Sequence, residues 1–178
     1  MSVRAGRAED IEQAVQTLTR AFERDDLAQW LFPDLDKRRD LMGAMFTSLL
    51  TSPPPGSVVE VTDDLRGVAI WAEPGQPLHV DPPPGASAAA EDLFAGVAAR
   101  APVGSFWYLH FIGAQEAGTG VGSTLLRHRH AAIGSAPSAL WTGAQRNLAF
   151  YRKNGYQVAS EHSVDGATAW WLSRQPAS

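Results

Sequence analysis

The sequence of 178 residues contains no cysteine. A chain without thiols has no disulfide framework, no thiolate zinc site and no cysteine nucleophile, and it fits a reducing cytoplasm. Long apolar runs are missing as well: no stretch approaches the roughly 18 apolar residues of a membrane span, and the first ten residues lack the apolar segment of a secretory signal. We therefore expect a cytoplasmic protein with no membrane partner.

Basic charge is also scarce. The chain carries 15 Lys and Arg against 19 Asp and Glu, which gives a formal net charge of −4, and its longest basic run is the triplet at residues 37–39. Nucleic-acid-binding proteins typically show a basic stripe, so nucleic acid is not an expected partner. We interpret the triplet as the solvated start of a helix.

The hydrophobic pattern predicts an α/β (α+β) fold with a mixed central β-sheet flanked by helices, in a single domain over residues 1–178. Strands are expected at residues 2–5, 58–62, 68–71, 106–112, 138–142, 156–164 and 167–173. Helices are expected at residues 9–24, 37–50, 86–101, 124–133 and 145–153. A proline-rich loop occupies residues 74–85.

Residues 106–112 form an almost wholly apolar run without charge, which is typical of a strand in the middle of a sheet. The side chains of a regular strand alternate between the two faces of the sheet. Alternation predicts one face with Tyr108, His110 and Ile112, and another with Trp107, Leu109 and Phe111.

Three glycines at every second position, Gly118, Gly120 and Gly122, separate this strand from the next helix. Such a turn can point successive N–H groups into one concavity at the positive end of the helix dipole, which makes an anion site. The pattern differs from G-x-G-x-x-G because its third glycine comes one residue early, and it lacks the lysine of a Walker loop. The glycines alone leave two hypotheses open: a pyrophosphate cradle of backbone amides, or a flexible loop.

A second motif lies downstream, where a strand leads into a helix with Asn147, Phe150 and Tyr151, followed by Gly155 and Tyr156. The two motifs, in this order and about this far apart, resemble the GNAT superfamily of acetyl-CoA-dependent N-acetyltransferases. Residues 4–22 are similar to the opening strand and helix of that family.

The resemblance implies a GNAT-like fold, acetyl-CoA as cosubstrate, no metal, and direct transfer of an acetyl group to the amine of a small-molecule or peptide acceptor. It implies that a backbone N–H at Ile112 or Ala114 meets the oxyanion. The cofactor-binding residues it implies are Ile112, Gly113, Ala114, Ala117, Gly118, Thr119, Gly120, Val121, Gly122, Ser123, Asn147 and Tyr151. A homodimer is compatible with it.

Tyr151 is the candidate acid for the leaving thiolate, because a phenol with a pKa near 10 stays protonated at neutral pH. It lies one helical turn after Asn147, which either fixes the helix start or bonds the cofactor. His110 is the candidate base, as the titratable side chain of the central strand. A core role is the alternative for both Tyr151 and His110. Other candidate bases are Glu60, Glu73, Asp25 and Asp26.

The sequence departs from the family pattern at Ala117, where Gln or Arg is usual, and between Ile112 and Gly118, where about two residues are missing. These departures support a second hypothesis, a catalytically inactive GNAT-like binding or regulatory module. We expect the acceptor to be selected by the first two helices, residues 74–85 and the last strands with Trp170 and Trp171. His128 and His130 are two apart on a helix, so we expect a solvated surface there and no metal site.

Overall fold

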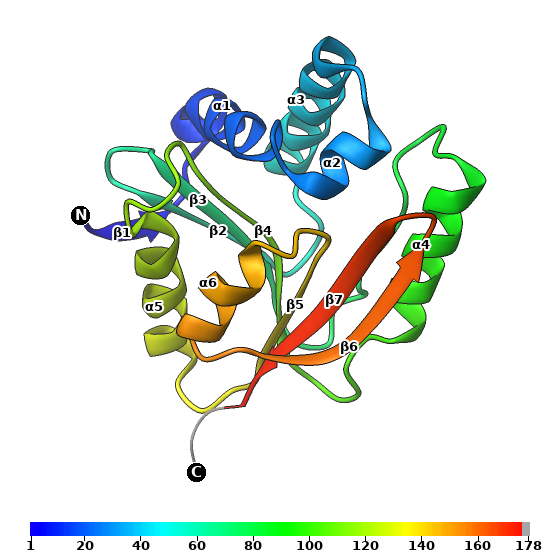
Figure 1. The fold of residues 1–178 in the computed structure, drawn as a ribbon. Helices are drawn as coiled ribbons and strands as arrows, with labels where there is room; N and C mark the ends of the chain where they lie inside the picture. Colours follow the sequence, from blue (N-terminus) through cyan, green and yellow to red (C-terminus); the bar gives the residue numbers. More distant parts are fainter. Residues whose placement is uncertain (176–178) are drawn as a thin grey trace.

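A computed structural model describes residues 1–175 as a seven-stranded sheet with helices on both faces (Figure 1). The strands are β1 (Val3–Ala5), β2 (Ser57–Thr62), β3 (Gly67–Ala72), β4 (Trp107–Ala114), β5 (Ser138–Thr142), β6 (Gln157–Val164) and β7 (Ala167–Arg174). The helices are α1 (Ile11–Phe22), α2 (Asp26–Leu31), α3 (Leu35–Thr51), α4 (Ala88–Ala99), α5 (Val121–Ile133) and α6 (Asn147–Lys153), with a 3-10 turn at Ala8–Asp10.

The strand order is β1-β2-β3-β4-β5-β7-β6. Strands β4 and β5 pair in parallel and the other neighbours pair antiparallel. The predicted α/β fold with a mixed central sheet is therefore confirmed. So is the position of the apolar strand, since β4 is the fourth of the seven.

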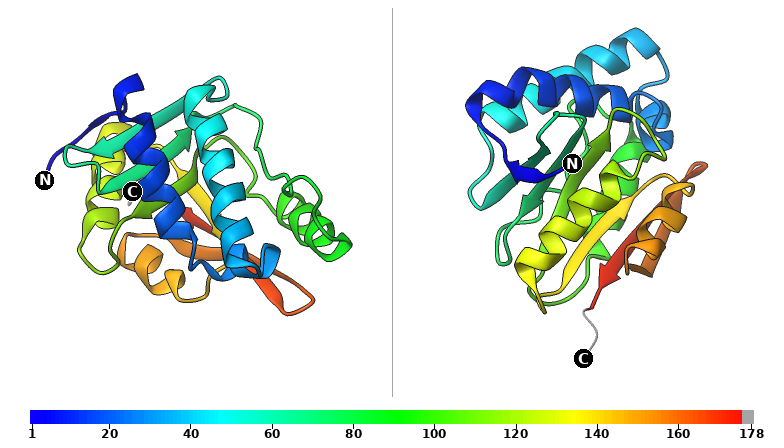
Figure 2. Two further views of the ribbon diagram at one scale, coloured as in Figure 1. Left: turned by 90° about the horizontal axis from the view of Figure 1, so that it is seen from above. Right: turned by 90° about the vertical axis from the view of Figure 1, so that its left-hand side faces the viewer.

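Two layers of helices enclose the sheet (Figures 1 and 2). Helices α5 and α6 pack on one face, over a core that includes Leu109, Leu125 and Leu172. On the other face, α1 and α3 lie side by side over β2 and β3. Helix α4 covers β6 and β7 on that face.

A β-bulge interrupts β4 at His110. Ile70 of β3 pairs with Phe111, but its neighbour Trp71 pairs with Leu109, so His110 is the extra residue. An extra residue breaks the alternation of side chains beyond it. Accordingly Leu109 and Ile112 both pack on the α5 side, whereas Phe111 packs under α1 and α3. Because of this bulge, the predicted alternation was wrong for Ile112 and Phe111. The sequence does not indicate the bulge, since no glycine or proline stands there.

Helix α2 was not predicted, because six residues are too few to show a helical period. Asp25 caps it by accepting hydrogen bonds from the N–H groups of Leu27 and Ala28, at 3.0 and 3.1 Å. Leu27 lies so close to Gly143 that a Cβ on that glycine would come within 2.6 Å of it. Trp30 Nε1 donates to the carbonyl of Asp165, in the turn between β6 and β7 (3.3 Å). Helix α2 thus bridges two loops that are distant in sequence.

The solvated histidine surface expected on α5 was wrong for His130. Its Nε2 lies 3.0 Å from the Tyr156 hydroxyl, which in turn lies 3.0 Å from Ser138 Oγ. Burial, followed by the charge of Arg174, lowers the pKa of His130 to about 4. The prediction that residues 37–39 are solvated is also wrong for Arg38, which is buried. Among the helices of residues 1–175, none is long and apolar enough to cross a bilayer.

Candidate active site

Strands β4 and β5 form a wedge. They pair only at Trp107 with Ser138 and at Tyr108 with Ala139. Beyond these pairs both strands continue, to Ala114 and Thr142, and their residues line one cleft. The centre of the sheet is therefore open along β4 from Leu109 to Ala114.

The backbone of β4 offers hydrogen bonds to whatever fills this wedge. Alternate residues of a strand direct their N–H and C=O groups to opposite sides. Gln115 N–H donates to the carbonyl of Arg66 on the β3 side, at 2.9 Å. By alternation the backbone groups of Ile112 and Ala114 point the other way, into the wedge.

The cleft has a volume of about 1640 Å³ and runs from the glycine loop to helices α1, α2 and α3. It brings together every cofactor-binding residue predicted from the sequence and both predicted catalytic residues. The residues concerned are His110, Ile112, Gly113, Ala114, Ala117, Gly118, Thr119, Gly120, Val121, Gly122, Ser123, Asn147 and Tyr151.

The glycine loop turns directly into α5. Gly118 and Gly120 have φ of +79° and +81°, which only glycine adopts readily, and the space beside both is open. Helix α5 begins at Val121, three residues earlier than predicted, so the N–H groups of its first turn lack helical acceptors. An exposed loop of this kind at the start of a 13-residue helix fits a phosphate group.

The third glycine has a different task. A Cβ on Gly122 would lie 2.9 Å from Phe150 Cζ, so this glycine lets α6 approach α5. Asn154 Nδ2 strengthens the contact by donating to Ser123 Oγ at 3.1 Å. The loop thus serves both the cradle and the placement of α6.

The shortened connection before the loop is tied to α1. Gln115 Nε2 donates to Thr17 Oγ1 at 3.1 Å, and Thr17 Oγ1 donates to the carbonyl of Leu65 at 2.8 Å. Ala117 is exposed and takes no part in these two hydrogen bonds. The short loop is therefore anchored although the usual Gln or Arg is missing.

Tyr151 lies on α6 with its side chain buried in the cleft wall. Burial, followed by the negative charges of Tyr156, Asp25 and Tyr108 in their ionised forms, raises the pKa of its phenol well above the usual value. Tyr151 therefore holds its proton across the physiological range. Asn147 lies in the same cleft, with its Nδ2 at 3.5 Å from Thr142 Oγ1.

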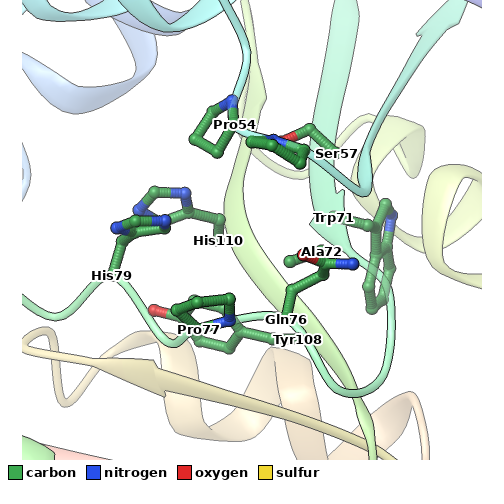
Figure 3. Close-up of a pocket in the computed structure, with 10 residues that line it drawn as sticks. Pro54, Ser57, Trp71, Ala72, Gln76, Pro77, His79, Tyr108 and His110 are labelled. Carbon is green, nitrogen blue, oxygen red and sulfur yellow. The ribbon is translucent and has the colours of Figure 1, made fainter.

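His110 is placed between the cleft and a second, smaller cavity of about 10 Å³, room for a single water molecule (Figure 3). Figure 3 shows the imidazoles of His79 and His110 in this cavity with the ring of Tyr108. Burial, and then the charge of His79, lowers the pKa of His110 to about 4. His110 is therefore neutral at pH 7 and can accept a proton, but only as a weak base.

Two of the alternative bases, Glu60 and Asp25, differ in where they lie relative to the cleft. Glu60 is buried on β2 against Arg129, with Oε1 to Nη2 at 2.6 Å, and is an ion-pair partner outside the cleft. Asp25 lines the cleft, and burial raises the pKa of its carboxyl. The sequence does not distinguish Asp25 from the other candidate bases, because α2, the helix that it caps, was not predicted. An Asp directly before a short apolar helix is the signal that could have found it.

The placement of Trp170 and Trp171 does not support their expected role in selecting the acceptor. Neither lines the cleft; Trp171 is buried and donates to the carbonyl of Val97 at 2.7 Å. Trp141, the cross-strand partner of Trp171, lines the cleft instead. Phe22 of α1 and His79 of residues 74–85 do line the cleft, and their role in selecting the acceptor stays a prediction.

Comparison with known proteins gives a uniform result for the fold. No protein-family model matches the sequence. A Corynebacterium glutamicum protein described as "histone acetyltransferase HPA2 and related acetyltransferase" is 23% identical, with a TM-score of 0.76 over 99% of this chain and 97% of the other.

Two further structures share the architecture at lower identity. A protein of the yellow fever mosquito, described as a putative arylalkylamine N-acetyltransferase, is 17% identical to this chain. Its TM-score is 0.62, over 97% of this chain and 86% of the mosquito chain. A PaiA N-acetyltransferase from Thermoplasma acidophilum, solved with coenzyme A, is 13% identical, with a TM-score of 0.58 over 98% of each chain. The fold of this chain is therefore the fold of the GNAT acetyltransferases.

Proposed function

We propose that this chain is an acetyl-CoA-dependent N-acetyltransferase, acting as one domain that transfers the acetyl group directly to an amine. The observation that carries the proposal is the wedge between β4 and β5, which opens onto the glycine loop at the start of α5. The coenzyme A bound to the Thermoplasma relative supports the same cosubstrate here. The lack of cysteine fits both direct transfer and a cytoplasmic location, which stays a prediction.

The residues divide the work as follows. Amides of residues 118–123 hold the pyrophosphate, and the backbone of Ile112 and Ala114 hydrogen-bonds the pantetheine and the thioester oxygen. Acetyl-CoA supplies the activated acyl group. Tyr151 donates its proton to the sulfur that leaves, a service worth about 10²–10⁴-fold in rate. Among the groups that line the cleft, His110 and Asp25 are our candidates for taking a proton from the amine.

Ligand binding provides the first test. Acetyl-CoA at about 100 times its Kd stabilises a protein by about 2.7 kcal/mol, which raises Tm by several degrees in a chain of this size. We expect this shift with acetyl-CoA and with CoA in thermal unfolding. No shift at millimolar ligand would contradict the proposal.

A pair of glycine variants locates the ligand. Gly120→Ala forces alanine to φ near +81° in the cradle, and Gly134→Ala imposes a positive φ at the far end of the same helix. Both variants lose stability, but only Gly120→Ala weakens acetyl-CoA binding, by at least about tenfold. Equal Kd values in the two variants would place the phosphates elsewhere.

A further assay distinguishes an enzyme from a catalytically inactive binding module. The shortened loop and Ala117 motivate that second hypothesis, although Gln115 anchors the loop to Thr17. A thiol-release assay over a panel of primary amines decides between the two. Acetyl-CoA binding without thiol release from any amine would favour the binding module.

A further inference from the structure

The part of the cleft between α2, residues 79–83 and the ends of α1 and α3 has aromatic walls. Phe22 and Phe111 stand edge to face with centroids 5.5 Å apart. Phe94 and Trp141 form a second edge-to-face pair at 5.3 Å. All four side chains line the cleft. We call this region the acceptor pocket, and its walls suit a flat apolar group.

Asp25 lies at this pocket, and only one of its two carboxylate oxygens accepts hydrogen bonds within residues 1–175. Its Oδ1 accepts both N–H bonds of the α2 cap, and Oδ2 has no hydrogen-bond partner in residues 1–175. The cap fixes the orientation of the side chain, because two backbone N–H groups hold one oxygen in place. Oδ2 is therefore a positioned acceptor on a residue that lines the cleft.

The neighbouring carboxylates are already engaged. Glu23 receives Arg39 on both oxygens, at 2.9 and 3.2 Å, and Asp26 lies 3.4 Å from Arg146 Nη1. Asp25 makes no ion pair within residues 1–175; Arg146, Asp26 and Tyr151 are the charged or titratable groups that act on it. A partly desolvated carboxylate without a cation is stabilised by one that a ligand brings.

Asp25 and Tyr151 line the same cleft. Asp25 is among the groups whose negative charge raises the pKa of Tyr151. Leu27, two residues on, packs against Gly143 at the end of β5, beside the wedge. An ammonium group held at Oδ2 is thus brought to the same region as the proton that the leaving sulfur needs.

We propose that Asp25 receives the ammonium group of the acceptor, and that the acceptor is a primary amine carrying an aromatic group. This inference rests on the proposed function. Oδ2 takes one proton from R–NH₃⁺, and the nitrogen lone pair of R–NH₂ then attacks the thioester carbon. The C–N bond forms, the C–S bond breaks, the nitrogen loses its second proton to water and Tyr151 protonates the sulfur. The proton on Asp25 then returns to the Tyr151 phenolate, so that one proton is released to solvent overall.

The test compares phenethylamine with 2-phenylethanol, which has the same ring and chain but no charge. We expect the wild-type protein, saturated with CoA, to bind phenethylamine at least about tenfold more tightly in calorimetry, as a charged hydrogen bond provides. Asp25→Asn removes the charge but keeps a good helix cap, so it folds and loses this preference. Asp26→Asn, the adjacent matched control outside the cleft lining, keeps it.

Three outcomes overturn the inference: equal affinity of the wild-type protein for the two ligands, an unchanged preference in Asp25→Asn, or binding of neither ligand. Acetyl-CoA binding measured on the same samples keeps the two proposals apart. A wild-type protein that binds acetyl-CoA but shows no preference loses only the Asp25 inference. A wild-type protein that does not bind acetyl-CoA contradicts the acetyltransferase itself.

Discussion

At the scale of single residues, the most informative group in the cleft is the phenol of Tyr151. Its side chain is buried, yet it lies on the wall of a large cleft, and its raised pKa keeps it protonated well above neutral pH. A nearby tyrosine offers a comparison. Tyr156 also has a raised pKa, about 12, but its hydroxyl is engaged by Ser138 and lies outside the cleft lining.

Tyr151→Phe removes only the hydroxyl. We expect kcat to fall by about 10²-fold or more, because proton donation to the thiolate is lost, while the Kd for CoA stays within about twofold. The measurement is steady-state thiol release together with calorimetry. Because the pKa is raised, the wild-type enzyme should show no loss of kcat from this group up to pH 9.

Tyr156→Phe is the matched control for that variant. It removes a hydroxyl of the same type and costs stability, since Ser138 and His130 lose a partner, but it should leave kcat within about twofold. Equal kcat values in the two variants would remove Tyr151 from the chemistry.

At the scale of elements, the packing of α1 on β4 depends on Gly113. A Cβ at this position would lie 2.9 Å from Ala21 Cβ and 3.1 Å from Leu18 Cδ2. Ala21 has no flexible side chain that could move aside, so relief requires a shift of the helix. This contact holds α1 against the strand that carries Ile112 and Ala114.

Gly113→Ala should therefore destabilise the protein by about 1–3 kcal/mol, the usual cost of overpacking. Adding Ala21→Gly removes the facing Cβ and should recover part of the loss, as urea unfolding will show. Gly43→Ala is the control, because its Cβ would meet only Thr19 Oγ1 at 3.9 Å. In the interior of α3 it should stabilise by about 0.5–1 kcal/mol. No recovery in the double variant would mean that α1 is not the obstacle.

The elements also show what the sequence could and could not predict. Long periodic helices such as α1 and the uniformly apolar β4 were recognised because burial imposes a regular pattern on them. The bulge at His110 and the six-residue α2 were not, because both arise from tertiary contacts and leave no period. The loop residues 117–123, which line the cleft, could be singled out because they form a contiguous motif, whereas Asp25 lies on the short helix α2 that packs on Gly143.

At the scale of the whole molecule, two half-buried histidines set the acid limit of stability. His110 and His130 have pKa values near 4 in the folded protein, below the value of about 6.5 in an unfolded chain. The unfolded state then binds more protons between these values, so their contribution is complete above pH 6.5 and is lost as the pH falls toward 4. Asp10 and Asp64, with pKa values of about 2, lose theirs only at lower pH.

We expect the free energy of unfolding in urea to decrease between pH 6.5 and 4.5. The double variant His110→Asn/His130→Asn should show a flatter dependence over this range, whatever its stability at pH 7. A wild-type protein equally stable at both ends of the range would show that these histidines do not titrate differently on unfolding.

The wedge has one more consequence for the molecule as a whole. Two residue pairs are all that join β4 to β5, so the sheet consists of a four-strand half and a three-strand half with a short seam between them. A ligand whose amides bond to Ile112 and Ala114 adds rungs to that ladder, and so acts as a substitute for missing strand. Amide hydrogens along the seam should then exchange slowly only while the cosubstrate is bound, and the two halves should open separately once it leaves. Bound acetyl-CoA would in this way complete the sheet that holds it.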